Sequence, residues 1–247
     1  MTPVVGTTPK GVNTEEAASR WVRGMFGKIA RRYDLLNHLL SFNMDKRWRG
    51  RTVQCVSAIL CDPNARVLDL CCGTADVLLL MEQQARGARV IGSDFCHPML
   101  VEAKRKIAIR KLKSPLFEAD ALVLPLQNES LDLITVAFGF RNFANYRSGL
   151  DELARVLKPG GTLAVLEFSQ PTNPIFGSLY GLFSTRVLPM VGGLISGSSD
   201  AYSYLPESIR KFPGAEDLAE QMRSAGFAMV EFERMTFGAV ALHLAKK

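Results

Sequence analysis

The stretch VLDLCCGTAD, residues 67–76, joins a short apolar strand to a tight turn around a single glycine. Short apolar runs and helical patterns alternate around it, in the order ARVLDL, ADVLLLMEQQA, ARVIGSD, HPMLVEAKRKIAIRKL, PLFEAD, LDLITVAF, SGLDELARVL and GTLAVLEFS. This alternation predicts βα units, and hence a mainly parallel sheet with helices on both faces. Two further strand candidates flank a short turn at residues 236–238, which predicts a terminal hairpin with at least one antiparallel strand.

Two segments depart from this alternation. The first has helical patterning, with an expected N-cap at Asn13 followed by apolar residues at helical spacing. The second, from about residue 170 to 213, is interrupted by Pro, Gly and Ser. We therefore expect an N-terminal helical cap at residues 1–62 and an α/β domain at residues 63–247 that contains an insertion at about 170–213.

The composition is that of a globular protein. The 247 residues are 47% hydrophobic and 22% charged, which suits one sizeable core with additional elements. The N-terminal sequence MTPVVGTTPKGVN has no apolar run, so it lacks the pattern of a secretory signal. Without such a signal, the five cysteines indicate reduced thiols. No uninterrupted apolar stretch is long enough to span a membrane, and we expect a cytoplasmic location.

The net charge of +6 arises in the N-terminal segment. Residues 1–51 contain ten Lys or Arg and four Asp or Glu, whereas the remaining residues contain twenty of each kind. A basic segment of this kind can lie against anionic lipid or nucleic acid. It can equally be a solvated helix face, which is at least as common. Peripheral contact with the inner face of the cell membrane is therefore one open expectation.

The turn at residues 69–76 indicates the kind of ligand. In doubly wound sheets the ligand lies beyond the carboxyl ends of the strands, beside the first strand. Asp69 precedes a turn with the single glycine Gly73, and the G-x-G-x-x-G spacing of dinucleotide sites does not occur there. A second acid, Asp94, ends the next predicted strand. Two acids and a small-residue turn suit a cationic ligand with a ribose, and S-adenosylmethionine fits that description.

Cys71 and Cys72 invite three interpretations. Adjacent cysteines cannot easily supply two ligands to a tetrahedral zinc, and the sequence has no C-x-x-C or H-x-x-x-H motif, so we expect no metal. A vicinal disulfide would close a strained ring in a reducing compartment. The remaining interpretation is that cysteine is a small, polarizable residue that lets the ligand approach the backbone. Gly73 would then be the position that needs a positive φ or the absence of a Cβ, and Ala75 would need only modest conformational freedom.

Longer motifs carry a resemblance to a known family. VLDLCCGTAD, VIGSDF, FEADALVLP and LKPGGTLAVLEFS resemble the successive motifs of the class I adenosylmethionine-dependent methyltransferases. That resemblance implies a Rossmann-like sheet of seven strands, mostly parallel, with an antiparallel C-terminal hairpin. YDLLNHLLSFNMDKRWR, FGFRNF and YSYLPESIRKFP further resemble the menaquinone and ubiquinone biosynthesis C-methyltransferases over nearly the whole chain. The sequence departs from that family's usual residues at Asn43, Asp45, Ala75 and Ala137.

The resemblance implies roles for individual residues in holding S-adenosylmethionine. Thr74 and the turn around Gly73 would hold the methionine part, and Asp94 would accept hydrogen bonds from the ribose. Asp120 would receive the adenine amino group, and the backbone of Ala121 would contact the ring edge. The full set of expected cofactor-binding residues is Asp69, Cys71, Gly73, Thr74, Asp94, Phe95, Asp120, Ala121 and Ala137.

The resemblance also implies methyl transfer to a ring carbon of a hydroquinone that carries a polyprenyl tail. Arg141 and Asn142 follow the fourth predicted strand and could donate to a phenolic oxygen as negative charge develops on it. The Asn- or Asp-Pro-Pro-aromatic turn of nucleic-acid amino-methyltransferases does not occur here, so no nucleic acid is expected. The candidates for the general base are His38, Asp45, Tyr202 and Tyr204.

The tail and the acceptor leave alternatives open. An apolar channel for the tail is expected from the N-terminal helices and the insertion, at Tyr33, Leu36, Leu39, Leu40, Phe42, Phe176, Leu179, Tyr180, Leu182 and Phe183. Apolar residues at this spacing are usually core, so some of them must be. The acceptor could be a naphthoquinol, a benzoquinol or another phenol, and a non-catalytic scaffold that binds the cofactor is a further alternative. The sequence does not decide whether the protein forms a homodimer.

Overall fold

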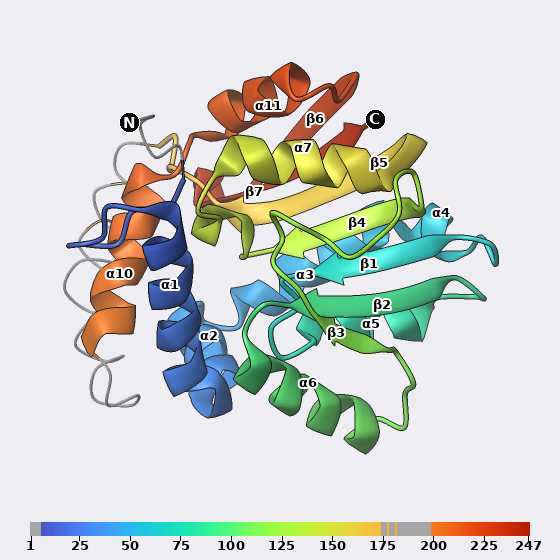
Figure 1. The fold of residues 1–247 in the computed structure, drawn as a ribbon, viewed down its shortest axis with the longest axis horizontal. Coiled ribbons are helices and arrows are strands. Elements are labelled where there is room, and N and C mark those ends of the chain that lie inside the picture. Colours follow the sequence, from blue (N-terminus) through green and yellow to red (C-terminus); the bar gives the residue numbers. More distant parts are fainter. Residues whose placement is uncertain (1–5, 174–176, 178–180, 182–198) are drawn as a thin grey trace.

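The computed structural model describes residues 6–173, 177, 181 and 199–247 and, for residues 199–203, the backbone only. One seven-stranded sheet runs through its centre in the order β3-β2-β1-β4-β5-β7-β6 (Figure 1). The strands are β1 (Arg66–Leu70), β2 (Arg89–Asp94), β3 (Leu116–Glu118), β4 (Leu131–Ala137), β5 (Leu157–Phe168), β6 (Met229–Met235) and β7 (Val240–Lys246).

The pairing of the strands confirms the predicted fold class. β1 lies between β2 and β4 and pairs with both in parallel. β7 pairs antiparallel with β5 and with β6, so the C-terminal hairpin supplies the antiparallel strand. The first strand is buried at four of its five residues, as expected for a central parallel strand that is covered on both faces.

Helices cover the two faces of the sheet in separate groups. On one face, α7 (Tyr146–Val156) and α11 (Ala215–Ser224) share a core with β1, β4 and β5. On the other face, α3 (Met44–Cys55), α4 (Ser57–Leu60), α5 (Asp76–Gln84) and α6 (His97–Ile109) contribute to a second core. Although α3 and α4 precede residue 62, they therefore pack as part of the α/β layers.

The N-terminal cap lies at the carboxyl ends of the parallel strands, together with α10 (Ser199–Lys211) from the insertion (Figure 1). It consists of α1 (Glu15–Ile29), the short η1 (Ala30–Arg32) and α2 (Tyr33–Leu40). The N-cap of α1 is Thr14, whose hydroxyl accepts the amide of Ala17 at 3.3 Å, so the prediction of Asn13 was wrong by one residue. The cap thus covers the edge of the sheet where a ligand is expected.

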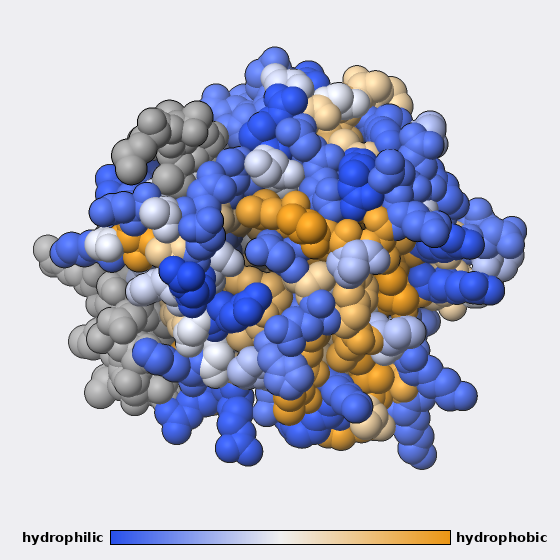
Figure 2. All heavy atoms as spheres, viewed as in Figure 1, coloured by the Kyte–Doolittle hydropathy of each residue, from blue (hydrophilic) through white to orange (hydrophobic). Residues whose placement is uncertain are grey.

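The connection between β3 and β4 contains no helix. It crosses the region between α6 and α7 in Figure 1, and apolar side chains gather in this part of the surface in Figure 2. Val123 of this connection is three-quarters exposed. In the part of the chain that the structure describes, no helix is both long and apolar enough to cross a membrane.

Candidate active site

The turn after β1 is held in an unusual backbone conformation. Cys71, Gly73 and Ala75 all have positive φ angles, of 55°, 54° and 74°. The left-handed conformation expected for Gly73 is confirmed. Ala75 differs from the expectation, because it too is left-handed and its Cβ makes that conformation costly. Alternating left-handed residues turn the chain sharply enough to bring the turn beneath the cap.

The two adjacent cysteines fill space behind this turn. Both are free thiols, and burial raises the pKa of each well above its ordinary value, so neither is a thiolate. Cys71 packs against Gly139, where a Cβ would lie only 2.4 Å from the Cβ of Cys71. Cys72 lies on the other side, where its Sγ would be 3.2 Å from a Cβ on Gly92. Small side chains at these positions let the turn approach two neighbouring strands.

Two buried carboxyl groups lie at the carboxyl ends of β1 and β2. Asp69 accepts the hydroxyl of Thr135 at 2.6 Å through Oδ1, while no described residue bonds its Oδ2. Asp94 accepts the amides of Gly73 and Cys96, at 2.9 and 2.8 Å. Burial raises the pKa of Asp69 to about 7 and that of Asp94 to about 6. Such a pair is suited to a cationic ligand, which would replace the lost solvation of both carboxylates.

A small cavity joins the predicted cofactor residues to a predicted acceptor residue. It has a volume of about 30 Å³, and its lining includes Cys71, Phe95, Asp120, Ala121 and Asn142. Asp120 caps its own turn, because its Oδ1 accepts the amide of Leu122 at 3.0 Å. Ser19 of α1 forms part of the lining, so the cap closes this side of the site.

Arg141 is held by a partner that the sequence interpretation missed. Its Nη1 donates to Glu167 at 2.8 Å and to the carbonyl of Phe138 at 2.7 Å, and both charged side chains are almost fully buried. Burial by itself would lower the pKa of the Arg141 guanidinium, but the charge and hydrogen bond of Glu167, together with smaller interactions with Tyr33 and Tyr204, outweigh it and the pKa is raised. Arg141 is therefore a permanent cation and a donor, not a base. Among the described residues, none bonds its Nε.

Asn142 and Tyr204 form a second hydrogen-bonded group in the site. The hydroxyl of Tyr204 donates to Oδ1 of Asn142 at 2.9 Å and lies 2.6 Å from Oγ1 of Thr7. Burial raises the pKa of Tyr204, so the phenol remains protonated. The side chain of Tyr202 lies outside the described residues. Tyr204 therefore connects α10 to the acceptor side of the sheet and fixes the amide of Asn142.

Comparison with known proteins decides the family. The model described as the ubiE/COQ5 methyltransferase family matches residues 13–247. The chain belongs to this family. A relative from Thermus thermophilus named demethylmenaquinone methyltransferase is 50% identical over 90% of this chain and 100% of its own length. A relative from Syntrophotalea carbinolica named ubiquinone/menaquinone biosynthesis C-methyltransferase UbiE is 41% identical over 94% of this chain and 96% of its own.

The fold agrees with this assignment. A SAM-dependent methyltransferase from Aquifex aeolicus matches 80% of this chain and 97% of its own with a TM-score of 0.55, at 18% identity. Family and fold together make the chain an enzyme that uses S-adenosylmethionine as its methyl donor. The residues present fit that donor, because the unbonded oxygen of Asp69 and the raised pKa values of both buried acids favour a cation at this turn.

The structure brings Tyr33 of the cap into the site, where the sequence interpretation had assigned it to the tail channel. Its Cε1 lies 3.8 Å from the position that a Cβ on Gly73 would take. Burial raises the pKa of Tyr33, and the charges of Arg141 and Asp94 both act on its phenol. Tyr33 therefore lies between the donor turn and the acceptor residues. Its position two residues before Leu35 in an amphipathic helix gave no sign of this.

His38 and Asp45 belong to a separate group of polar side chains. Nδ1 of His38 lies 2.7 Å from Oδ2 of Asp45, which also accepts from Arg49. Burial by itself would raise the pKa of Asp45, but its bond with Ser41 and the charge of Arg49 lower it. Asp45 is therefore an anion with three partners. It is occupied as a structural acceptor, which makes it an unfavourable base.

Side chains of the same group could in principle hold a metal ion. Among the described residues, one set of three could hold an ion, formed by His38, Asp45 and Asp76. Arg49 donates Nη1 to Asp45 and places the same atom 3.3 Å from Asp76. A guanidinium thus already supplies the positive charge between these carboxylates.

Of the other predicted cofactor residues, Ala137 ends β4 and packs partly buried against the core that contains Trp48.

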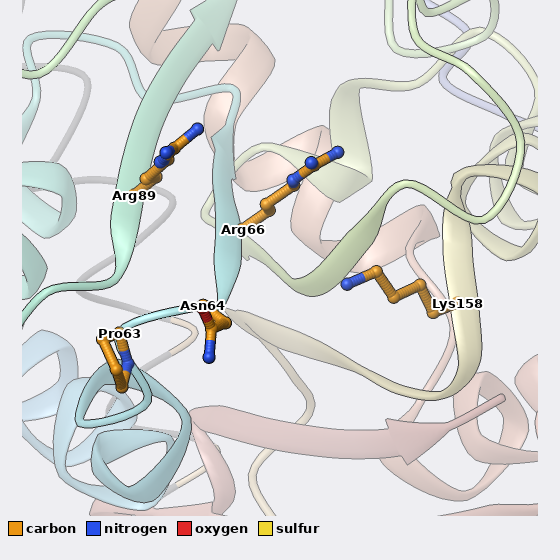
Figure 3. A pocket seen from close by; sticks show the side chains of 5 residues that line it. All are labelled: Pro63, Asn64, Arg66, Arg89 and Lys158. Carbon is orange, nitrogen blue, oxygen red and sulfur yellow. The ribbon is translucent and has the colours of Figure 1, made fainter.

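A larger cavity lies at the opposite edge of the sheet and is not part of this site. It has a volume of about 320 Å³ and is lined by Pro63, Asn64, Arg66, Arg89 and Lys158 (Figure 3). Arg66 and Arg89 begin β1 and β2, so this cavity is at the amino ends of the strands. Of the two cavities this one is the larger, whereas the other lies at the carboxyl ends of the strands, where the ligands of such sheets bind, and is lined by Cys71, Asp120 and Asn142.

Proposed function

We propose that this enzyme transfers the methyl group of S-adenosylmethionine to a ring carbon of a polyprenylated hydroquinone, with demethylmenaquinol as the acceptor. The observation that carries the proposal is that one cavity is lined both by Asp120 and Ala121, on the donor side, and by Asn142, on the acceptor side. The names of the relatives support the acceptor, since the Thermus thermophilus protein is a demethylmenaquinone methyltransferase.

The residues on the acceptor side suit an oxygen anion beside the reacting carbon. A ring carbon becomes nucleophilic when the neighbouring hydroxyl loses its proton, so the site must stabilise the resulting phenolate. Arg141 is a buried cation whose Nε is not bonded by any described residue. Asn142 carries an amide that Tyr204 holds in place. These groups stabilise the oxygen, and the bound donor supplies an electrophilic methyl group on its sulfonium.

Four ionisable side chains in and around the site are poor bases, which leaves solvent as the acceptor of the hydroquinone proton. Arg141, Tyr33 and Tyr204 have raised pKa values and remain protonated near neutral pH. Asp45 is an anion already bonded to Ser41, His38 and Arg49. The contribution of the protein is therefore orientation and charge stabilisation, since the sulfonium is itself a strong methyl donor.

The experiment that tests the reaction is transfer of labelled methyl from S-adenosylmethionine to chemically reduced demethylmenaquinone in detergent. Parallel reactions contain the corresponding benzoquinol and both oxidised quinones. We expect label only on a reduced ring, with the naphthoquinol preferred, and about a hundredfold or greater loss of kcat in Arg141→Gln. Tight donor binding without transfer to any reduced ring would contradict the proposal and favour a scaffold.

Contact with the membrane surface is the second part of the proposal, because a polyprenylated acceptor resides in the bilayer. α2 exposes Leu35 and Leu39, by 60% and 47%, one turn apart on its outer face. The Arg31 side chain at the start of this region is 92% exposed. An apolar helix face beside cations suits an anionic lipid surface.

In the expected tail channel, Leu36 packs in the core, whereas Phe176, Leu179, Tyr180, Leu182 and Phe183 lie outside the described residues.

Vesicle flotation tests this contact independently of catalysis. We expect the protein to float with vesicles that contain anionic lipid and to remain at the bottom with zwitterionic vesicles. The double variant Leu35→Glu/Leu39→Glu should lose flotation. The matched control is Val101→Glu/Ile109→Glu, which places the same charges at two exposed apolar residues of α6. Equal flotation of both double variants would exclude α2 as the contacting face.

A further inference from the structure

A chain of polar side chains connects the cap to the glycine turn. The hydroxyl of Thr74 donates to Oδ1 of Asp34, at the start of α2. Oδ2 of the same carboxylate accepts from Lys106 of α6 at 2.8 Å. Nζ of Lys106 also donates to Asp76, the first residue of α5, and lies 3.4 Å from Oγ1 of Thr74. One lysine therefore bridges a cap carboxylate and a carboxylate of the α/β layers.

The network of polar side chains extends to α3. Nη1 of Arg49 lies 3.3 Å from Oδ2 of Asp76 and donates to Asp45. Asp45 is in turn bonded to His38, near the end of α2, at 2.7 Å. The two ends of α2 are thus attached to the same network. The side chains are partly or fully screened from water, with 4% of Asp45, 7% of Arg49, 18% of Lys106 and 32% of Asp34 exposed. Bonds in such surroundings are stronger than exposed ion pairs.

The residue beside Asp34 is Tyr33, whose ring lies against Gly73 and whose phenol is influenced by the charges of Arg141 and Asp94. Tyr33 and Asp34 are consecutive residues at the start of α2, so a displacement of this helix end would move both side chains relative to the glycine turn. Thr74 had been expected to hold the methionine part of the donor. In the structure its hydroxyl donates to Asp34 and lies 3.4 Å from Nζ of Lys106, and the residue is only 3% exposed.

We propose that Asp34 and Lys106 are positioning residues that latch the cap to the glycine turn and so hold Tyr33 over the methionine end of the bound donor. Breaking the latch removes a wall of the donor site without removing any group that the donor itself is expected to contact. The consequence is faster loss of the donor and a higher KM for it. The inference rests on the donor lying at this turn and not on the identity of the acceptor.

The decisive variant is Lys106→Met, which keeps most of the length of the side chain and removes its charge. Asp34 and Asp76 then face each other without the cation that bridges them, so the cap and the α/β layers repel at this point. We expect S-adenosylmethionine to bind about tenfold more weakly by titration calorimetry. Lys106→Arg retains the charge and should bind the donor within about threefold of the unmodified protein.

Two control variants separate the latch from general loss of stability. Arg105→Met removes a neighbouring cation of α6 that is 64% exposed and whose partner among the described residues is Glu102 of the same helix, so donor affinity should not change. Leu218→Ala opens the core under α11 on the opposite face of the sheet. It should lower the melting temperature at least as much as Lys106→Met while leaving donor affinity unchanged.

The rate of donor dissociation and the protease sensitivity of the cap complete the test. In Lys106→Met we expect about tenfold faster dissociation in stopped-flow measurements. We also expect the donor no longer to protect residues 28–32 from trypsin. Lowered stability in Lys106→Met with unchanged donor affinity would overturn the proposal and make the network purely structural. Because each readout uses the donor alone, failure here is distinguishable from failure of the proposed methyl transfer.

Discussion

Two buried charged pairs lie close together in this site, and they differ in what completes them. Arg141 and Glu167 have opposite charges and bond at 2.8 Å, so each neutralises the other within the protein. Asp69 and Asp94 have like charges, and among the residues described one oxygen of Asp69 has no partner. The first pair is complete in the folded chain. The second is complete only when a cation binds, which makes it a recognition element for the donor.

The largest expected effect comes from breaking the complete pair. Glu167→Gln leaves the buried Arg141 guanidinium without a counter-charge and weakens the acceptor of two backbone amides, those of Arg141 and Phe168. We expect the free energy of unfolding to fall by about 3–5 kcal/mol in urea titrations. Arg147→Gln, which breaks the exposed pair with Asp151, should cost less than about 0.5 kcal/mol. Equal small losses in both variants would remove the contrast between the pairs.

Asp69→Asn should have the opposite effect on stability. The folded pKa of Asp69 is about 7 and the unfolded value is 3.8, so between these values the folded state binds the proton more tightly. Asp69 therefore destabilises the donor-free protein as pH rises through this window, and its cost is complete above pH 7. We expect Asp69→Asn to raise the free energy of unfolding by about 1–3 kcal/mol at pH 8. The gain should disappear near pH 4.

The same variant should weaken donor binding. A bound cation favours the ionised carboxylate, so in the unmodified protein donor affinity should rise between pH 5 and pH 8, and calorimetry at several pH values measures it. In Asp69→Asn most of this rise should be absent, with about tenfold weaker binding at pH 8. Thr135→Val, which removes the hydroxyl bonded to Asp69 but keeps the carboxylate, should retain the pH dependence. An unchanged pH profile in Asp69→Asn would exclude this carboxylate from donor recognition.

The smallest expected effect concerns the turn between the two acids. Ala75 has a φ of 74° and Asn43, before α3, has a φ of 59°. Alanine is strained in this region whereas asparagine tolerates it. Ala75→Gly should relieve strain but lose a buried methyl group, giving a net change within about 1 kcal/mol. Asn43→Gly should change stability by less. A loss above about 2 kcal/mol in Ala75→Gly would show that packing, not backbone strain, dominates at the turn.

Sequence patterns determined the layers of the fold and the acids of the donor site. The alternation of apolar runs and helical patterns predicted the parallel strands and the helices that cover both faces, and Asp69 and Asp94 stand at the ends of their strand patterns. Local signals of this kind arise within a few residues, so they can be recognised along the chain. The longer motifs carried the family for the same reason, and the match over residues 13–247 confirmed it.

Tertiary structure alone decided which side chains meet across long separations. Glu167 lies 26 residues from Arg141, and Lys106 lies 72 residues from Asp34, and neither pairing has a local signal. Tyr33 belonged by its spacing to an apolar helix, yet the cap places its ring against Gly73. Burial likewise set the raised pKa values of Asp69 and Asp94, because desolvation depends on everything that packs around a group. The sequence identified the two acids, and only the packing of the folded core gave them the raised pKa values that favour a bound cation.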